Sequence, residues 1–223
     1  VKEHKTKVVG YGTAGGINTR YFTKEAINGA IDVRSEFNIR KEDFVFCFVG
    51  RMVGDKGINE LVEAFDHLSR IFGNVHLLLV GSVEDRLDPL SNMTQILLST
   101  NKRIHAVGHQ NDVRPYLAAS NAFVLPSYRE GVGMVLLEAN AMGVPCIATN
   151  IIGCRDVVLP SVNGELVEPR NTEDLYGKMK KWVESPELLK EMSDKCRDYV
   201  CERYSHDAVR DAYYTTYCAL AKK

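Results

Sequence analysis

From residue 44 onward, the chain alternates short apolar runs with segments long enough to form amphipathic helices. Because the runs are rich in Val, Ile, Phe and Leu, they favour strands. They occupy residues 44–50, 76–81, 104–108, 122–126, 145–149 and 164–169. Strands that alternate with helices are typical of βα units, whose strands are buried in a parallel sheet. The pattern predicts an α/β fold with a parallel sheet of about six strands and helices on both faces.

The segments between and after these runs carry helix signals. Residues 58–72 and 132–142 place apolar side chains at helical spacing, so both are predicted to pack on the sheet. Asn171 is a suitable cap for a helix over residues 172–183, and Pro186 is a suitable first residue of another. The chain is therefore expected to end in helices, the last of them capped by Ser205.

Charge and composition exclude several kinds of partner. The 28 Lys and Arg residues nearly balance the 29 Asp and Glu residues, and a net charge of -1 gives no long-range attraction for nucleic acid or an anionic membrane. No run reaches the roughly 18 apolar residues that a membrane span needs. The six cysteines include no C-x-x-C pair and follow no secretion signal, so we expect reduced thiols. Any anionic ligand must be held by local groups.

The first candidate site is the segment GRMVGDKG, residues 50–57, which follows the first strong strand and precedes a helix. Strand carboxyl ends and helix amino termini meet at such a place, where free N–H groups and the helix dipole favour an anion. Arg51 and Lys56 add two positive charges. The segment suits a diphosphate, although a solvated loop with incidental basic residues would have the same pattern. It is not a Walker loop, because G-x-x-x-x-G-K-[ST] is absent.

The second candidate site is EGVGMVLLE, residues 130–138, at the entrance to a helix. Gly131 and Gly133 allow a ligand to approach the backbone closely. A carboxylate accepts two hydrogen bonds at once, so Glu130 and Glu138 suit the neighbouring hydroxyls of a sugar or a ribose. Most helix glutamates are simply solvated. Glu138 has apolar neighbours in the sequence, however, which predicts a carboxylate at the edge of the core.

A different class of ligand is indicated by VVGYGTAGG, which holds G-x-G-x-x-G at Gly10, Gly12 and Gly15. Asp32 follows at about the spacing of the acidic residue in dinucleotide-binding proteins. This pattern would make the chain an NAD-dependent oxidoreductase. Against that hypothesis, the residues that follow Gly15 have no apolar stripe and make a poor helix.

The two candidate sites together carry a resemblance. The pattern E-G-x-G-x-x-x-x-E-A-x-A-x-G-x-P resembles the donor motif of the retaining GT-B glycosyltransferases, especially family 4, and residues 50–57 are similar to that family's phosphate motif. The resemblance continues through residues 107–127, IIGCRDVV and NGELVEP, and covers about residues 8–200. Within it, GCRDVV is similar to the corresponding segment of bacterial surface-polysaccharide transferases. One local departure is Asn140, where the family often has Met.

The resemblance implies a role for each residue of the two sites. Arg51 and Lys56 would hold the donor pyrophosphate, Glu138 the ribose hydroxyls, and Glu130 the transferred sugar. The base would lie near residues 109–112, largely on backbone contacts. The candidate catalytic residues are Arg51, Lys56 and Glu130; the candidate donor-binding residues are Gly50, His109, Gln110, Asp112, Gly131, Val132, Gly133, Met134, Val135 and Glu138.

The resemblance also implies a domain organisation. We expect residues 1–40 to be a linker or edge segment, with a short strand and turn around Gly10 and a helix over residues 23–37. Residues 41–200 would form the Rossmann-like nucleotide-sugar-binding domain, which is the second half of a GT-B fold. Residues 201–223 would form the crossover helix, which in this chain would alternatively cover the sheet or pair with another chain. The amino-terminal domain that holds the acceptor is expected to be missing.

The function implied is transfer of a hexose-type sugar from a nucleotide diphosphate, with retention, to a glycan or lipid-linked acceptor in polysaccharide or capsule biosynthesis. UDP is the expected nucleotide because it is the commonest donor. We expect no cofactor, and no metal, because D-R-L-D at Asp85 and Asp88 lacks D-x-D spacing. The expected location is the cytoplasm, with at most peripheral contact with the inner face of the membrane. The alternative is a module that binds nucleotide sugars without turnover.

Overall fold

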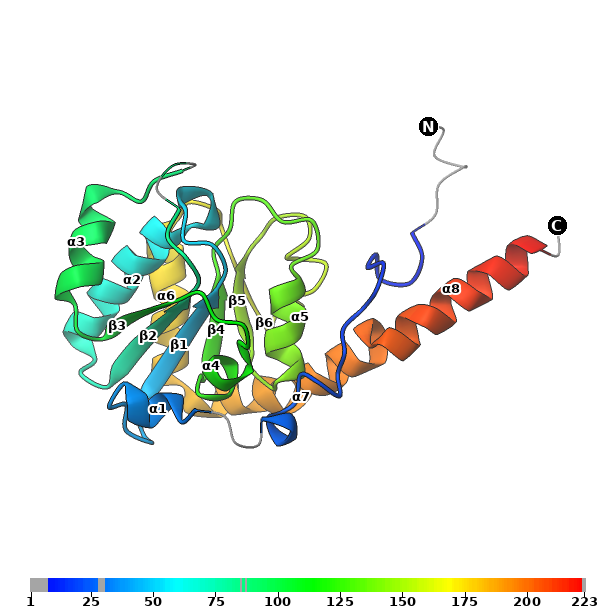
Figure 1. The fold of residues 1–223 in the computed structure, drawn as a ribbon, viewed down its shortest axis with the longest axis horizontal. Helices are drawn as coiled ribbons and strands as arrows, with labels where there is room; N and C mark the ends of the chain where they lie inside the picture. The colour runs from blue at the N-terminus through cyan, green and yellow to red at the C-terminus, as the bar shows by residue number, and fades with distance from the viewer. Residues whose placement is uncertain (1–7, 28–30, 85, 87, 222–223) are drawn as a thin grey trace.

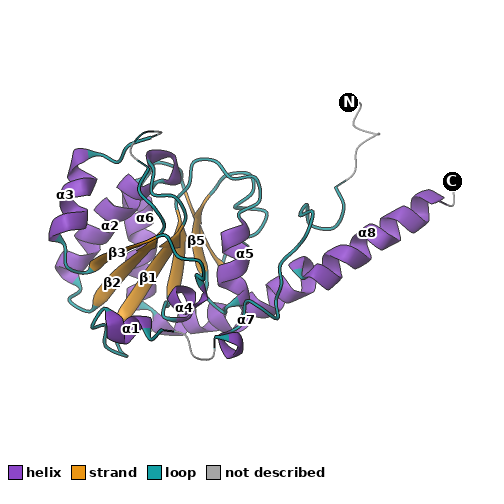
Figure 2. Ribbon diagram, in the orientation of Figure 1, coloured by secondary structure: helices purple, strands orange, loops and turns teal. Residues whose placement is uncertain are grey.

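The computed structural model describes residues 8–27, 31–84, 86 and 88–221. Its centre is a six-stranded sheet in which all neighbouring strands are parallel and the order is β3-β2-β1-β4-β5-β6 (Figures 1 and 2). The strands are β1 (Phe44–Val49), β2 (Val75–Val80), β3 (Ile104–Gly108), β4 (Ala122–Leu125), β5 (Cys146–Thr149) and β6 (Gly164–Val167). All six strands predicted from the apolar runs are confirmed.

Helices cover both faces of the sheet. They are α1 (Val33–Glu36), α2 (Ile58–Ile71), α3 (Asn92–Thr100), α4 (Arg114–Ala118), α5 (Met134–Ala141), α6 (Thr172–Glu184), α7 (Pro186–Tyr204) and α8 (His206–Ala221). Figure 1 shows α2, α3 and α6 on one face and α4 and α5 on the other, and α5 packs on α7. Within the described residues, no helix is both long enough and apolar enough to cross a membrane.

The apolar stripe of α2 shows why this element is a helix packed on the sheet. Its fully buried side chains include Leu61, Phe65 and Leu68, which are spaced four and three residues apart and therefore share one face. Burial of one large aliphatic or aromatic side chain contributes about 2 kcal/mol. The sheet supplies the other side of this contact, since all four residues of β4 are buried.

Asn140 of α5, which carries no predicted role, belongs to a buried polar contact. Its Nδ2 donates to the carbonyl of Val144 (3.0 Å), and its Oδ1 accepts from Nδ2 of Asn163 (2.6 Å). Asn163 also donates to the carbonyl of Val157 (2.9 Å). A buried amide stabilises a fold only when its donors and acceptors are satisfied. This pair therefore joins α5 to the segment before β6.

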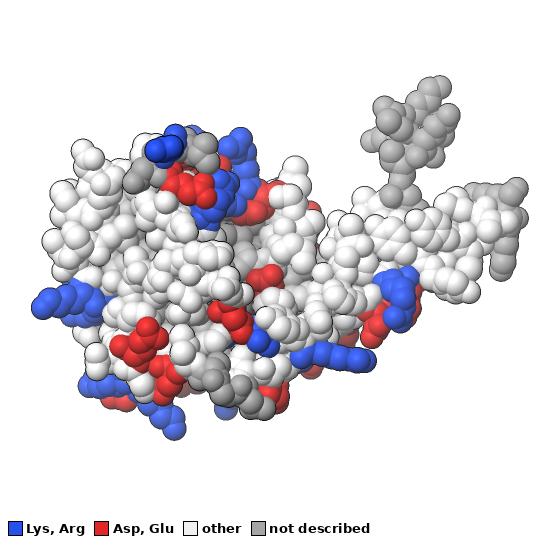
Figure 3. All heavy atoms as spheres, in the orientation of Figure 1, with Lys and Arg blue, Asp and Glu red and all other residues white. Residues whose placement is uncertain are grey.

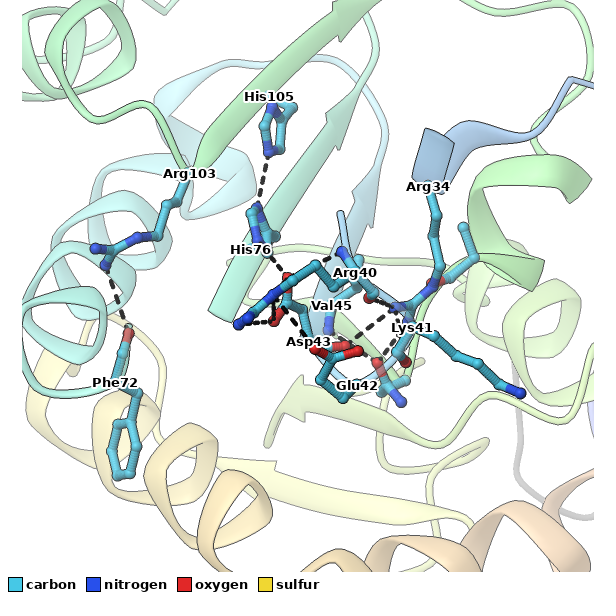
Figure 4. A network of polar contacts seen from close by, with 12 residues as sticks. Arg34, Arg40, Lys41, Glu42, Asp43, Val45, Phe72, His76, Arg103 and His105 are labelled. Atoms are coloured by element: carbon cyan, nitrogen blue, oxygen red, sulfur yellow. Dashed lines mark hydrogen bonds and ion pairs between the residues drawn. The ribbon is translucent and has the colours of Figure 1, made fainter. Parts of the chain in front are cut away.

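A second polar network lies at the amino ends of β1, β2 and β3 (Figure 4). Nδ1 of His76 lies 3.1 Å from Nε2 of His105, and Nε2 of His76 lies 3.4 Å from the Asp43 carboxylate, which is paired with Arg40. Burial lowers the pKa of His105 to about 4, so the ring is uncharged at neutral pH. The network is structural, because ligands bind at the opposite, carboxyl edge of such sheets.

The predictions for the first 40 residues are wrong in two respects. Within residues 8–16 no strand forms, while Lys7 lies outside the described residues. The helix expected over residues 23–37 is replaced by a 3₁₀ turn at Lys24–Ala26 and by α1, with residues 28–30 not described. Asp32 caps α1 by accepting from the N–H of Ser35 (3.2 Å). The segment lacks the continuous apolar stripe that would hold a longer helix on the sheet.

The glycine-rich segment packs on the last two helices instead. The N–H of Ile17 donates to the carbonyl of Tyr204 (2.7 Å), and Gly16 has φ +67° against that backbone. A dinucleotide-binding turn needs a strand before the glycines and a helix after them. Among the described residues no helix follows Gly15 directly and no strand forms within residues 8–16, which argues against the oxidoreductase hypothesis. Helix α8 extends away from the sheet (Figure 1), and hence does not cover it.

Candidate nucleotide-sugar site

The two candidate segments meet at the point where the strand order reverses. The chain runs outward from β1 to β2 and β3, then returns to β4 beside β1 and continues outward on the other side. In open α/β sheets, the crevice beyond the carboxyl ends of these two central strands is the usual ligand site. The loop after β1 holds Lys56, and the loop after β4 holds Glu130. Sequence pattern and topology therefore select the same edge of the sheet.

The loops after β1 and β4 are packed directly on each other. The N–H of Tyr128 donates to the carbonyl of Asp55 (2.9 Å). Gly57 has φ +69°, and a Cβ at this position would lie 2.1 Å from the carbonyl oxygen of Pro126. Only glycine allows both this backbone conformation and this close approach. The contact fixes where α2 begins relative to the loop that carries Glu130.

Lys56 and Glu130 form an ion pair across this contact. Their Nζ and Oε1 atoms are 2.7 Å apart, and the side chains are only 19% and 15% exposed. Partial burial strengthens the attraction, because water screens it less. Asp88 holds the short turn Gly54–Lys56 in place, since its carboxylate accepts from the N–H of Asp55 (2.5 Å). The predicted phosphate cation and the predicted sugar-binding carboxylate are therefore brought together.

Arg51 lies on the same edge but is turned toward another partner. Its guanidinium pairs with Glu84 (3.0 Å) and its side chain is 52% exposed. Next to it, Gly50 approaches Gly81 so closely that a Cβ on Gly81 would lie 1.8 Å from the Gly50 carbonyl oxygen. Figure 3 shows basic and acidic atoms side by side at the top of the molecule, above this edge. An exposed arginine with one surface partner is free to reorient toward a ligand.

The amino terminus of α5 offers backbone donors beside the ion pair. Gly133 caps the helix, which begins at Met134. Among the described residues, the N–H groups of Gly131, Val132 and Val135 have no acceptor. Unpaired N–H groups and the helix dipole attract negative charge. The backbone predicted to bind the donor is thus available to bind an anion or hydroxyl oxygens.

Glu138 lies one turn into α5, half-buried as the sequence predicted. Burial raises the pKa of its carboxyl to about 7. Its neighbours Leu137 and Ala139 are fully buried, which explains the low local polarity. A carboxyl with a pKa shifted to the working pH is typical of a functional position.

The three residues predicted near the base lie in the segment between β3 and α4. His109 is exposed, and Nε2 of Gln110 donates to the carbonyl of Val107 (3.0 Å). The Asp112 carboxylate pairs with Arg114 (2.6 Å), and this contact holds the pKa of Asp112 below its usual range. The segment follows a strand two positions from β1, so it shares the carboxyl edge without touching the Lys56 ion pair.

Further residues of the site were not identified from the sequence. A cavity of about 630 Å³ is lined by Glu130 and Gly131 and by the unpredicted residues Tyr128, Arg129, Ile151, Ile152 and Arg155. Gly153 allows the loop after β5 to join, because at φ +88° a Cβ there would lie 2.4 Å from the carbonyl oxygen of Gly131. IIGCRDVV contributed to the family resemblance, but nothing in its residue types indicated a cavity.

The arrangement suits a diphosphate bound next to a sugar. Lys56, Arg51 and the amides before α5 supply positive charge, while the carboxylates of Glu130 and Glu138 accept hydrogen bonds from hydroxyls. Within the described part of the chain, no three His, Cys, Asp or Glu side chains are placed to hold a metal ion. Asp85, one of the two aspartates considered for a metal, lies outside the described residues.

Comparison with known proteins gives the family. The family described as Glycosyl transferases group 1 matches residues 31–199. The chain is 29% identical over 222 residues to the capsular polysaccharide biosynthesis glycosyltransferase CapM of Staphylococcus aureus, covering 100% of this chain and 57% of CapM. It is also 29% identical over 181 residues to an Escherichia coli enzyme, UDP-Gal:alpha-D-GlcNAc-diphosphoundecaprenol alpha-1,3-galactosyltransferase, covering 78% of this chain and 46% of the enzyme.

Solved glycosyltransferase structures share the fold. HepE of Anabaena, solved in complex with UDP, superposes with a TM-score of 0.81 at 20% identity, covering 98% of this chain and 58% of HepE. The chain thus spans about half the length of the proteins it matches. The six-stranded parallel sheet corresponds to that of GT-B glycosyltransferases. On the match over residues 31–199, the chain belongs to the glycosyl transferases group 1 family.

Proposed function

We propose that this chain binds the nucleotide-sugar donor of a retaining hexosyltransferase. The observation that carries the proposal is the Lys56–Glu130 ion pair (2.7 Å) at the switch point of the sheet, beside unpaired amides before α5. The donor diphosphate would lie between Lys56, Arg51 and those amides. Glu130 and the backbone of residues 131–135 would hold the sugar, and Glu138 the ribose.

The proposed donor is a UDP-sugar. HepE was solved with UDP, and the name of the E. coli relative includes UDP-Gal, which supports uridine over other bases for this chain. The base would rest against residues 109–112, where the Asp112 carboxylate is already paired with Arg114. Recognition of the base would then depend mainly on backbone groups.

The proposed reaction moves the sugar from the diphosphate to an acceptor hydroxyl. The bond between the anomeric carbon and the diphosphate oxygen breaks, and a bond from that carbon to the acceptor oxygen forms on the same face. The leaving oxygen takes the acceptor proton, so UDP departs and the anomeric configuration is retained. Lys56 and Arg51 would stabilise the charge that develops on the diphosphate, as preorganised cations do in other enzymes.

The proposed acceptor is a glycan or a lipid-linked sugar of bacterial polysaccharide biosynthesis. Relatives named for capsular polysaccharide and for a diphosphoundecaprenol-linked sugar support this class. We place the reaction in the cytoplasm, with the membrane reached only through the acceptor. The alternative is that this chain, by itself, binds the donor without catalysing transfer. Tests on the chain alone therefore measure binding instead of turnover.

A nucleotide panel tests the proposed donor. UDP is expected to raise the melting temperature of the chain by several degrees at saturating concentration, because a ligand that binds only the folded state stabilises it. GDP and ADP should have smaller effects and NAD none. The measurement is a thermal-shift titration of the four compounds, with isothermal titration calorimetry for UDP. A melting temperature raised by NAD alone would refute the proposal.

The pKa of Glu138 predicts how UDP binding depends on pH. Because the folded pKa of about 7 lies above the ordinary 4.5, the empty chain loses stability as pH rises through this window. Ribose hydroxyls donate to the ionised carboxylate, so UDP affinity should rise with pH and level off above about 7. Binding near neutral pH should release protons, measurable by calorimetry in buffers of different ionisation enthalpy. In Glu138→Gln, the pH dependence should fall to the part that comes from the terminal phosphate of UDP, whose second pKa is about 6; an unchanged pH dependence would exclude Glu138 as the ribose ligand.

A further inference from the structure

The loops after β1 and β2 run side by side beyond the sheet. The N–H of Met52 donates to the carbonyl of Ser82 (2.8 Å), and the N–H of Glu84 donates to the carbonyl of Met52 (3.4 Å). Met52 and Val83 form a parallel bridge, so the pairing of the two strands continues past their carboxyl ends. These backbone contacts bring Glu84 beside Arg51, and the ion pair between them is therefore set by the fold.

Glu84 neutralises one of the two cationic side chains of the proposed diphosphate site. Its Oε2 lies 3.0 Å from Nη1 of Arg51, and its side chain is 32% exposed. The other cation, Lys56, is paired with Glu130 (2.7 Å). Glu130 has a second proposed task, which is to hold the transferred sugar, whereas no step of the proposed reaction uses Glu84. If Glu84 affects the ligand, it does so through its charge.

The charge of the bound nucleotide changes in the proposed reaction. Free UDP carries about one more negative charge than a nucleotide sugar above neutral pH, because its terminal phosphate is not esterified and has a second pKa of about 6. A guanidinium without a partner would attract UDP more strongly than the nucleotide sugar. A guanidinium paired with a carboxylate is neutral as a unit, and the carboxylate repels the additional charge of UDP. The Arg51–Glu84 pair therefore favours the less charged ligand.

We propose that Glu84 is a charge-selective residue of the donor site, which returns to Arg51 when UDP leaves and weakens the binding of UDP more than that of the nucleotide sugar. The inference rests on the proposed function and concerns product release from the same site. The Glu84 carboxylate competes with both ligands for the guanidinium. It also repels the charge that the diphosphate gains when its bond to the sugar breaks. UDP then dissociates more readily, and the site is emptied for the next donor.

Two probes separate this effect from recognition of the sugar. UDP and its β-methyl ester share the base, the ribose and the diphosphate, and at about pH 8 they differ by about one negative charge. The ester has the charge of a nucleotide sugar but no sugar that a pocket can accept or reject. The measurement is isothermal titration calorimetry of the chain with each probe at about pH 8 and low ionic strength, where surface charges are least screened.

In Glu84→Gln we expect UDP to bind about fivefold more tightly and the methyl ester only about twofold more tightly, because the repulsion that is removed grows with the charge of the ligand. Glu84→Asp keeps the charge, so the ratio of the two affinities should stay near that of the wild type. The difference between the probes should shrink in about 0.5 M salt. The matched control is Glu184→Gln, which removes an exposed carboxylate paired with Lys180 (3.2 Å) in α6.

The possible results separate this inference from the proposed function. A gain in affinity that is larger for UDP than for the ester, and that is absent from Glu84→Asp and Glu184→Gln, supports the charge-selective role. Weaker binding in Glu84→Gln would show that Glu84 instead positions Arg51 for the ligand.

Unchanged affinity in Glu84→Gln, equal gains for the two probes, or the same gain in Glu84→Asp would also overturn the charge-selective role. A wild type that binds UDP but not the ester would do so as well. Each of these results leaves the donor site standing. If the wild type binds neither probe, the proposed function fails, and this inference fails with it.

Discussion

Replacing Lys56 with alanine is expected to lower kcat for sugar transfer by about 1000-fold in a protein that carries both halves of the GT-B fold. The reason is that Lys56 is the least exposed cation of the proposed diphosphate site and is fixed 2.7 Å from Glu130. Loss of one preorganised group that stabilises transition-state charge costs about 100-fold to 1000-fold in other enzymes. The measurement is initial-rate kinetics with a UDP-sugar, together with UDP affinity of the chain by calorimetry.

The Lys56→Ala variant also leaves Glu130 without its partner, so a double-mutant cycle is needed. We expect Glu130→Gln and Lys56→Ala to be strongly non-additive in UDP affinity, because the two side chains are in contact. Lys102→Ala is the matched control, since it alters an exposed lysine before β3, at the amino edge of the sheet. Turnover that is normal in Lys56→Ala, or equally reduced in Lys102→Ala, would rule out the proposed role.

The parts of the fold that sequence predicted are those where one physical signal dominates. Runs such as residues 44–49 are too apolar to lie anywhere but in the sheet, and α2 has a continuous buried stripe. Helices α3 and α4 were not identified. In α3 only Thr94 is buried, so it has no buried apolar stripe, and α4 is five residues long. Their positions follow from tertiary contacts instead of local pattern.

In the candidate site, too, some residues follow from local sequence signals and others depend on tertiary contacts. Lys56 and Glu130 were predicted because their types and spacing match a chemical task, and the structure places them in contact. The role of Asp88 was not predicted, because it depends on a hydrogen bond to the N–H of Asp55 across 33 residues of sequence. Arg155 was missed for a related reason. Whether an arginine lines a cavity is decided by long-range packing, and the sequence alone does not show it.

Close packing at Gly57 holds the two loops of this site together. Gly57→Ala is expected to lower the free energy of unfolding by about 3 kcal/mol. The residue combines φ +69° with a Cβ position 2.1 Å from the Pro126 carbonyl oxygen, and backbone is the least adaptable neighbour. To relieve this overlap, the start of α2 must move away from the loop after β4. That movement separates Lys56 from Glu130, so the folded variant should also bind UDP at least about tenfold more weakly.

Urea unfolding and calorimetry measure the two effects of Gly57→Ala separately, since binding can be recorded under conditions where the variant is fully folded. The control is Gly177→Ala in α6, where no atom lies within 4 Å of the added Cβ and φ is not in the left-handed region. Alanine should stabilise that helix by about 0.5 to 1 kcal/mol. If Gly57→Ala keeps both the stability and the UDP affinity of the wild type, then close packing of the two loops does not position Lys56. If the fully folded variant binds UDP more weakly than wild type, the loss of stability does not explain the weaker binding. The effect then lies in the contact between the two loops that form the donor site.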